Sequence, residues 1–339
     1  MSHKNSKVAR AKMPAIISAF NSADRLPVAN GEMPVHIIHQ AANDSRFGET
    51  YYSEPLTTFS TGYRDPNNIQ ATLEFFAPTV PAPGRLFEWK KWNNSEEFYS
   101  EADDVRAIGA DFKRVEFTGI DQTGKTLNKG LTVRIDLDQA APGWEERWTA
   151  KLLRRLYRNE LRRAFALLSA AATNTAKTWD TTAGKDPDQD VLTALIAGND
   201  ASGIYPNRVG YGHTAWAKRI LAHRAQLSAG GFASAGSAPD SVAGFLNVDQ
   251  VYVSKERYQN AAATKAQIVS NLVLMFMAAS GGDIEDPSNI KRFVSPVIGG
   301  GQQRVYQQQM SAKLVDITVE YYSALVMTST LGVQQLTIS

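Results

Sequence analysis

The chain has 339 residues, which is enough for two or three packed units, and its 43% apolar and 21% charged residues are ordinary for a folded protein. It contains no cysteine, so disulfide bonds, thiol nucleophiles and cysteine zinc sites are excluded. The net charge of +2 excludes a chain that binds polyanions by its overall charge.

The first element, residues 1–48, is predicted to be a polar arm. Four cations precede its first acidic residue, Asp24, and these are Lys4, Lys7, Arg10 and Lys12. By itself such an arm is expected to be disordered, and neighbouring chains are the simplest means of ordering it. The first twenty residues lack the apolar core of a secretory signal, and the most apolar run, 268–279, is shorter than the ~20 residues of a membrane helix. We therefore expect a soluble protein.

Residues 49–138 are predicted to be mainly extended. Turn signals recur within them, at 65–68, 81–84, 93–94 and 123–125. Between the turns, strands are predicted at Ala71–Phe76, Leu86–Trp92 and Phe112–Phe117.

One stretch of this region, GIDQTGKT at Gly119–Thr126, matches the nucleotide-binding pattern G-x-x-x-x-G-K-[ST]. That loop binds phosphate only where a strand leads into it and a helix begins within it, because the helix N-terminus then faces the anion. After Thr126, however, apolar and polar residues alternate from Leu131 to Asp138, which indicates a strand. We therefore interpret the stretch as a turn between two strands, with a nucleotide-binding enzyme as the alternative of another class.

Residues 143–173 are predicted to form one helix of roughly thirty residues, ~45 Å long. This length exceeds the common range of helix lengths in globular proteins and suits an element that braces a wide, thin molecule. Apolar side chains cover much of its circumference, with Glu160 and Arg163 as exceptions.

A basic stripe occupies one arc of the same helix. It consists of Arg147, Lys151, Arg154, Arg155, Arg158 and Arg162. Such a surface attracts polyphosphate irrespective of sequence, so these residues are candidate contacts for DNA. Salt bridges to acidic loops of neighbouring chains are an equally weighted alternative.

Further elements follow in the C-terminal half. Asp186 is expected to cap a helix over 186–197, with Pro187 at its first position. The remaining predictions are a strand at 208–212, a helix at 213–227, a loop at 228–241, strands within 245–254 and 266–278, a loop at 299–301 and an extended tail from Arg304 to Ser339.

Other candidate sites favour a structural interpretation. His36 and His39 point to opposite faces of a strand and are not expected to share a metal ion. The acidic cluster at 101–104 is expected to be a solvated loop, and His213 and His223 are expected to be polar surface residues. The aromatic run at 87–92 fits an interface strand better than a base-stacking platform.

From residue 70 onward the order of segments resembles that of the major capsid proteins of tailed bacteriophages. The long helix, ERWTAKLLRRLYRNELRRAFALL, stands where that family has its spine helix, with Glu160 as the usual acidic residue. The other matching segments are LEFFAPTVPAP, DDVRAIGADFKRVEF, TW at 178–179, DPDQDVLTALI, YPNRVGYGHTAWAKRILAH, FLNVDQVYVSKERYQN, IVSNLVLMFMA and KLVDITVEYYSALVMTSTLGVQQLTI. Each segment is weakly specific, and their order over roughly 270 residues carries the resemblance.

The resemblance implies an α+β chain with the tailed-phage major capsid (Hong Kong 97-like) fold. The implied parts are an N-terminal arm at 1–48, strands leading into the peripheral domain at 49–83, an extended loop and adjoining strands at 84–138, the spine helix of the peripheral domain at 139–180, the axial domain at 181–298 and returning peripheral-domain strands at 299–339. No scaffolding segment precedes the arm, so any scaffold is expected to be a separate protein or absent.

The implied function is that of a structural protein whose copies form the pentamers and hexamers of an icosahedral shell around double-stranded DNA. The shell belongs to the virion and is assembled in the cytoplasm of a host bacterium. Scaffold, portal or decoration proteins are further implied partners, whereas no membrane, cofactor, metal or catalytic residue is implied. Some relatives form Lys–Asn isopeptide bonds, but no residues here match that site. An encapsulin-type compartment, similar in fold, is the close alternative.

Overall fold

The structure is a computed structural model that describes residues 51–92, 106, 108–112, 119–279, 281, 284, 286–298 and 300–339. The chain divides into two units, Met1–Tyr52 and Ser53–Ser339, and the elements described below belong to the second. The predicted arm at 1–48, with His36 and His39, lies outside the described residues, as do the acidic cluster at 101–104 and most of the strand predicted at 112–117.

The first of two five-stranded sheets is built around the 14-residue strand β13 (Leu314–Met327). Its antiparallel partners are β4 (Leu127–Asp136), β11 (Ile290–Ser295) and β12 (Gln303–Gln309), and β1 (Thr79–Pro81) joins β11 in parallel. Ile317 and Val319 of β13 are fully buried in the main core. The alternate residue Asp316 is buried as well and accepts two hydrogen bonds from Arg134 of β4, at 2.8 and 3.1 Å.

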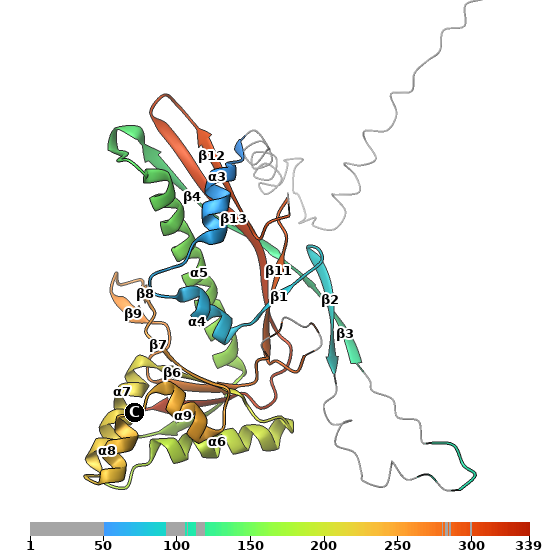
Figure 1. The fold of residues 1–339 in the computed structure, drawn as a ribbon, viewed down its shortest axis with the longest axis vertical. Helices are drawn as coiled ribbons and strands as arrows, with labels where there is room; N and C mark the ends of the chain where they lie inside the picture. The colour runs from blue at the N-terminus through green and yellow to red at the C-terminus, as the bar shows by residue number, and fades with distance from the viewer. Residues whose placement is uncertain are drawn as a thin grey trace, which may run out of the picture. The chain divides into compact units, whose positions relative to one another are not determined.

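Three helices cover this sheet or pack on one another. The longest is α5 (Trp144–Ala171), which lies along β13 and β4 (Figure 1). The helix α4 (Ile69–Phe76) packs on α5. The helix α3 (Glu54–Gly62) contacts β12. The buried face of α5 consists of Thr149, Leu152, Leu153, Leu156, Tyr157, Glu160, Leu161, Ala164 and Leu168. The 28-residue helix confirms the prediction for residues 143–173.

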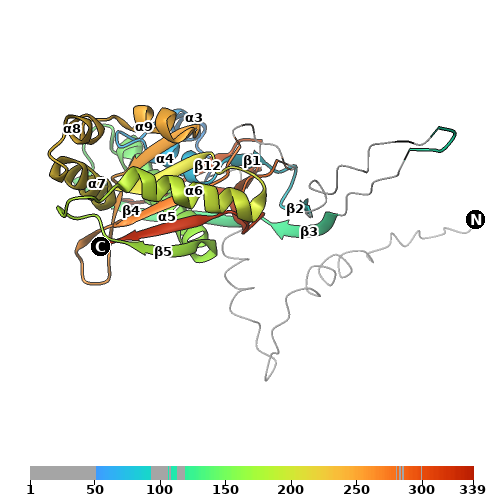
Figure 2. The same ribbon diagram turned by 90° about the horizontal axis from the view of Figure 1, so that it is seen from below.

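The second sheet has the strand order β5-β14-β10-β6-β7. Its strands are β5 (Thr173–Lys177), β14 (Gln334–Ile338), β10 (Leu272–Phe276), β6 (Arg208–Gly212) and β7 (Gln250–Ser254). Its helices are α6 (Pro187–Ser202), which lies against β14 (Figure 2), α7 (His213–Ala225), α8 (Ala229–Ala235) and α9 (Pro239–Leu246). The Asp186 side chain accepts hydrogen bonds from the N–H groups of residues 188 and 189, which confirms the predicted cap.

Two small antiparallel pairs complete the described strands. β2 (Leu86–Trp92), a confirmed prediction, pairs with β3 (Gly119–Lys125), and β8 (Arg257–Gln259) pairs with β9 (Lys265–Gln267). Phe87 of β2 stacks on Phe293 of β11 with ring centroids 4.1 Å apart, so the β2–β3 pair is anchored on the first sheet.

The segment at 49–83 was predicted to hold the strands that lead into the peripheral domain. Its described part, 51–83, contains the helices α3 and α4 and a single strand, β1. The stretch Ala71–Phe76, predicted to be extended, lies inside α4. Ile69, Leu73 and Phe76 are fully buried at i, i+4 and i+7, and this helical spacing outweighs the strand preference of the aromatic residues.

The predicted loop at 228–241 is also wrong, because it contains α8 and the start of α9. The Ser228 hydroxyl accepts a hydrogen bond from the Gly231 N–H and caps α8. Pro239 stands in the first turn of α9, where its missing N–H is not needed.

Strand pairing brings together segments that lie far apart along the chain. The predicted segments placed β5 with the spine helix, β11 with the axial domain and β14 with the returning peripheral strands. In the structure β5 and β14 belong to the second sheet, together with β6, β7 and β10, whereas β11 belongs to the first sheet. Alternation in a sequence predicts a strand but not its partner, so these pairings could not be derived from the sequence.

Asn289 joins the segments that cross between the two sheets. Its side-chain carbonyl accepts a hydrogen bond from the N–H of Met277, at 2.7 Å. Its amide group donates to the carbonyl oxygens of Ser329 and Leu331, at 3.1 and 2.8 Å. The crossing after β10 is thereby tied to the crossing after β13.

Candidate functional site

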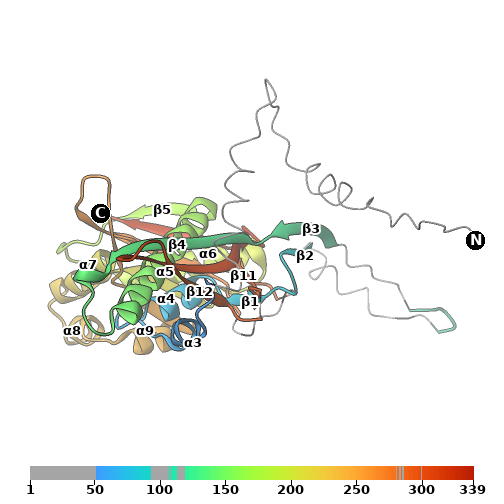
Figure 3. The ribbon, with the colours of Figure 1, turned by 90° about the horizontal axis from the view of Figure 1, so that it is seen from above.

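The stretch Gly119–Thr126 forms a strand rather than a phosphate-binding loop. Its first seven residues are β3, which pairs along its whole length with β2, from Gly119↔Trp92 to Lys125↔Leu86. Figure 3 shows β3 running on into β4, with no helix between them. The nucleotide-binding alternative is therefore wrong, because no helix N-terminus follows Lys125. The predicted turn is wrong too, since the segment is itself extended.

The last residues of this motif have packing roles. A Cβ on Gly124 would lie 2.6 Å from the Phe87 ring and 2.9 Å from Trp89, so the aromatic pair requires glycine here. Thr126 is fully buried, and its N–H donates to the Arg85 carbonyl oxygen at 2.8 Å. Its hydroxyl lies 2.8 Å from that of Ser295 on β11. These contacts hold the base of the β2–β3 pair against the first sheet.

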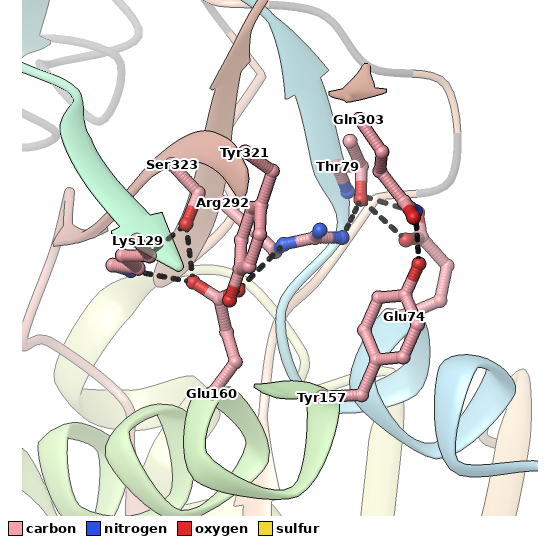
Figure 4. A network of polar contacts seen from close by, with 9 residues as sticks. All are labelled: Glu74, Thr79, Lys129, Tyr157, Glu160, Arg292, Gln303, Tyr321 and Ser323. Atoms are coloured by element: carbon pink, nitrogen blue, oxygen red, sulfur yellow. Dashed lines mark hydrogen bonds and ion pairs between the residues drawn. The ribbon is translucent and has the colours of Figure 1, made fainter. Parts of the chain in front are cut away.

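A fully buried carboxylate, Glu160, faces the first sheet from α5 (Figure 4). Its Oε1 lies 2.6 Å from Lys129 Nζ and accepts a hydrogen bond from the Ser323 hydroxyl at 2.5 Å. Its Oε2 accepts one from the Tyr321 hydroxyl at 2.5 Å and lies 3.7 Å from Arg292 Nε. One side chain of the helix thus engages β4, β11 and β13.

The surroundings hold Glu160 in its ionised form. Burial alone raises the pKa of its carboxyl group, but Arg292, Lys129 and the hydrogen bonds from Lys129 and Ser323 outweigh burial, and the net pKa lies below the ordinary value. Burial lowers the pKa of Lys129, and the charge of Glu160 opposes that effect. Burial and the same charge raise the pKa of Tyr321, which keeps its hydroxyl a proton donor.

The polar network continues from Arg292 toward α4. Arg292 Nη1 donates to the Thr79 hydroxyl at 2.9 Å, and Glu74 accepts hydrogen bonds from the N–H and the hydroxyl of Thr79, at 2.9 and 2.7 Å. Tyr157, on the same helix as the central carboxylate, is hydrogen-bonded to Gln303 of β12 (Figure 4). Two helices and several strands are therefore joined through one network.

This geometry suits a brace rather than an acid–base centre. A catalytic carboxyl group must reach a substrate, whereas Glu160 is fully buried and its two oxygens are engaged by Lys129, Tyr321 and Ser323. A cavity of 470 Å³ is lined by Arg292 and Tyr157, but Glu160 is not among its lining residues. The sequence signalled this site through one acid on an apolar helix face, which is also the usual acidic residue of the spine helix in the resembled family, but it assigned that acid no role.

The basic stripe of α5 divides into two groups. Arg154 and Arg158 contact carboxylates of the same chain, since Arg154 Nε lies 2.7 Å from Asp65 Oδ1 and Arg158 Nη2 lies 3.9 Å from Glu256 Oε2. Their charges are thus partly compensated.

The other four residues of the stripe, Arg147, Lys151, Arg155 and Arg162, are exposed. Lys151 lies over the Trp148 ring at 3.8 Å, and Arg162 lies over the Tyr258 ring at the same distance. The two rings attract these cations through cation–π contacts.

A second buried ion pair joins α6 to α7. Arg219 donates to both carboxylate oxygens of Asp188, at 2.6 and 2.7 Å, and His223 Nε2 lies 3.2 Å from the same carboxylate. His223 is only 4% exposed, so its predicted surface position is wrong, whereas His213 is exposed as predicted. Spacing of i and i+4 on α7 brings both side chains to Asp188.

The described residues contain neither a candidate metal centre nor a candidate membrane-spanning helix. No group of three or more His, Cys, Asp or Glu residues among them could hold a metal ion. Within the same residues, no helix has both the length and the apolar character needed to cross a membrane.

No protein-family model and no curated protein matches the chain. Among solved structures, a phage-related protein from Bordetella bronchiseptica RB50 is similar over 84% of this chain and 96% of its own, with a TM-score of 0.62 and 17% identity. The capsid structure of the cyanophage P-SCSP1u is similar over 93% of both chains, with a TM-score of 0.51 and 9% identity. A structure from Mycobacterium phage Adephagia is similar over 88% of this chain and 97% of its own, with a TM-score of 0.50 and 12% identity. The chain has the tailed-phage major capsid fold, as predicted.

Proposed function

We propose that this chain is a structural major capsid protein, whose copies form the pentamers and hexamers of a closed icosahedral shell. The observation that carries the proposal is the match to a cyanophage capsid structure over 93% of the chain. The burial of Glu160 supports a role without catalysis, because its carboxylate serves to brace α5. On this proposal the protein is a virion component that assembles in the cytoplasm of its bacterial host.

Assembly is tested by negative-stain micrographs and sedimentation of the purified full chain. Closed particles of uniform size are the expected result, because subunits of a shell share large interfaces. Monodisperse monomers that are fully stable to heat would refute the proposal.

We further propose that the shell encloses double-stranded DNA and that the exposed part of the basic stripe faces it. The supporting features are the charge of Arg155 and Arg162 and their exposure on α5. Charge reversal of both residues should leave particles that retain less nuclease-protected DNA, since each lost phosphate contact weakens binding. Arg224→Glu, at an exposed cation of α7, is the matched control.

Two outcomes would contradict this assignment. Equal DNA retention in the stripe variant and in the Arg224→Glu control would remove the stripe from the DNA-facing surface. Particles that hold a protein cargo instead of DNA would favour the encapsulin-type alternative.

A further inference from the structure

The second sheet ends at a strand with one open edge. Among the described strands, β7 pairs only with β6. Two cavities, of 420 and 430 Å³, follow β7 from Asp249 to Glu256 and share the lining residues Asp240, Val251 and Tyr252. Because α4 and α9 both contact β7, the cavities form one groove beside a strand edge. We call it the β7 groove.

The β7 groove is acidic. Its lining contains four carboxylates, those of Glu74, Asp240, Asp249 and Glu256. The cations of the same lining are Arg208 and Lys255. Arg208 donates to the carbonyl oxygens of residues 74 and 75, at 2.9 and 2.6 Å, and its charge also interacts with those of Glu74 and Asp249.

One groove carboxylate is incompletely compensated. Burial raises the pKa of Glu256, although the charge of Arg158 opposes this effect from 3.9 Å away. A further cation beside Glu256 would therefore favour its ionised form. The groove is suited to an extended segment that carries positive charge.

The chain itself contains such a segment. No acidic residue precedes Asp24, and the cations of the first twelve residues are Lys4, Lys7, Arg10 and Lys12. A free strand edge binds an extended peptide through main-chain hydrogen bonds, and side-chain charges then select the peptide. An extended segment of the length of residues 4–12 spans ~30 Å, which is enough to follow β7.

We propose that the basic segment at residues 4–12 of one copy binds in the β7 groove of a second copy as an added strand. The inference rests on the proposed self-assembly and names one contact within it. β5, at the other end of the same sheet, serves as a reference edge, because none of its residues lines the two cavities.

The absence of cysteine makes disulfide mapping in the full chain unambiguous. Ser6→Cys leaves the cations of the segment unchanged, and Gln250→Cys places a thiol at an exposed position of β7. The matched control is Thr175→Cys, at an exposed position of β5. Chains with one cysteine each, and with tags of different mass, are co-assembled in pairs and oxidised, so that each mixed disulfide reports a contact between two copies.

The mixed disulfide of Ser6→Cys with Gln250→Cys should form about tenfold faster than that with Thr175→Cys, because a docked segment has a high effective concentration beside the groove. Adding Asp240→Asn and Glu256→Gln to the chain that carries Gln250→Cys should slow formation of this disulfide about tenfold, since two ion pairs with the basic segment are lost. The same neutralisation at Asp200, an exposed acid of α6, should leave it unchanged.

Equal rates at the two strand edges, or no effect of neutralising the groove acids, would overturn the inference. Micrographs of the same samples separate this failure from that of the proposed function. Particles without the β7 disulfide refute only the docking contact, whereas the absence of particles refutes self-assembly.

Discussion

Replacing the buried carboxylate of Glu160 by an amide tests the role assigned to it. In Glu160→Gln the side chain keeps its volume, but Lys129 and Arg292 lose their counter-charge in a site that is fully buried at its centre. In the amide, an NH₂ group replaces one of the two carboxylate oxygens, and this group cannot accept the hydrogen bond of Lys129 or of Tyr321. Removing one partner of a buried ion pair costs about 3–5 kcal/mol, so we expect a loss of that size.

The free energy of unfolding is measured by denaturant titration at one fixed chain concentration, because assembly makes stability concentration-dependent. Glu146→Gln, at an exposed acid in the first turn of the same helix, is the matched control. Its effect should stay within about 1 kcal/mol, the range of a charge near a helix N-terminus. If the free energy of unfolding falls by less than about 1 kcal/mol in Glu160→Gln, or falls equally in both variants, Glu160 does not brace α5 against the first sheet.

The same residue predicts a pH dependence with a definite sign. The folded-state pKa of Glu160 lies below its ordinary value of 4.5, so the unfolded chain takes up the proton first as the pH falls. The stabilisation is therefore fully present above about pH 4.5 and is lost as the pH falls toward the folded-state pKa. In Glu160→Gln the free energy of unfolding should therefore fall less steeply as the pH decreases below about 4.5. The same decrease in the variant and in the unchanged protein would contradict the assignment.

Three further substitutions test the packing described above, each by thermal or denaturant unfolding of the full chain. Gly124→Ala should lower stability by about 1–3 kcal/mol through a clash with the Phe87 ring, whereas Gly62→Ala, with nothing within 4 Å of its Cβ, should not. Asp188→Asn should lower stability by about 3–5 kcal/mol because Arg219 loses a buried partner, and Asp200→Asn is its exposed control. Asn289→Ala removes three hydrogen bonds and should speed amide exchange at 277–279 and 328–331; unchanged exchange there would contradict its role in joining the crossings.

Local pattern was sufficient for several elements of the fold. The long run without glycine or proline after Gly143 predicted α5 nearly to the residue, because helical periodicity over many turns is a strong signal. Asp186 and Pro187 predicted the start of α6 through the chemistry of a helix N-terminus. Alternation after Thr126 predicted β4 and thereby excluded a phosphate loop. The order of such segments was also enough to suggest the capsid fold.

For short segments, the conformation depended on the parts of the chain that they pack against. Ala71–Phe76 has aromatic residues that suit a strand, but it is helical because Leu73 and Phe76 reach the core shared with α5 only at helical spacing. The choice of sheet for β11 and β14 likewise depends on partners far along the chain.

The sequence by itself determined the long helix, the alternating strands and the one acid on the apolar face of α5, because each is a local pattern of residue types. Only the tertiary structure decided what that acid does. The partners of Glu160 are Lys129, Arg292, Tyr321 and Ser323, which come from three strands distant in sequence. Their meeting depends on strand register and on burial, and neither is encoded in any short stretch of the chain.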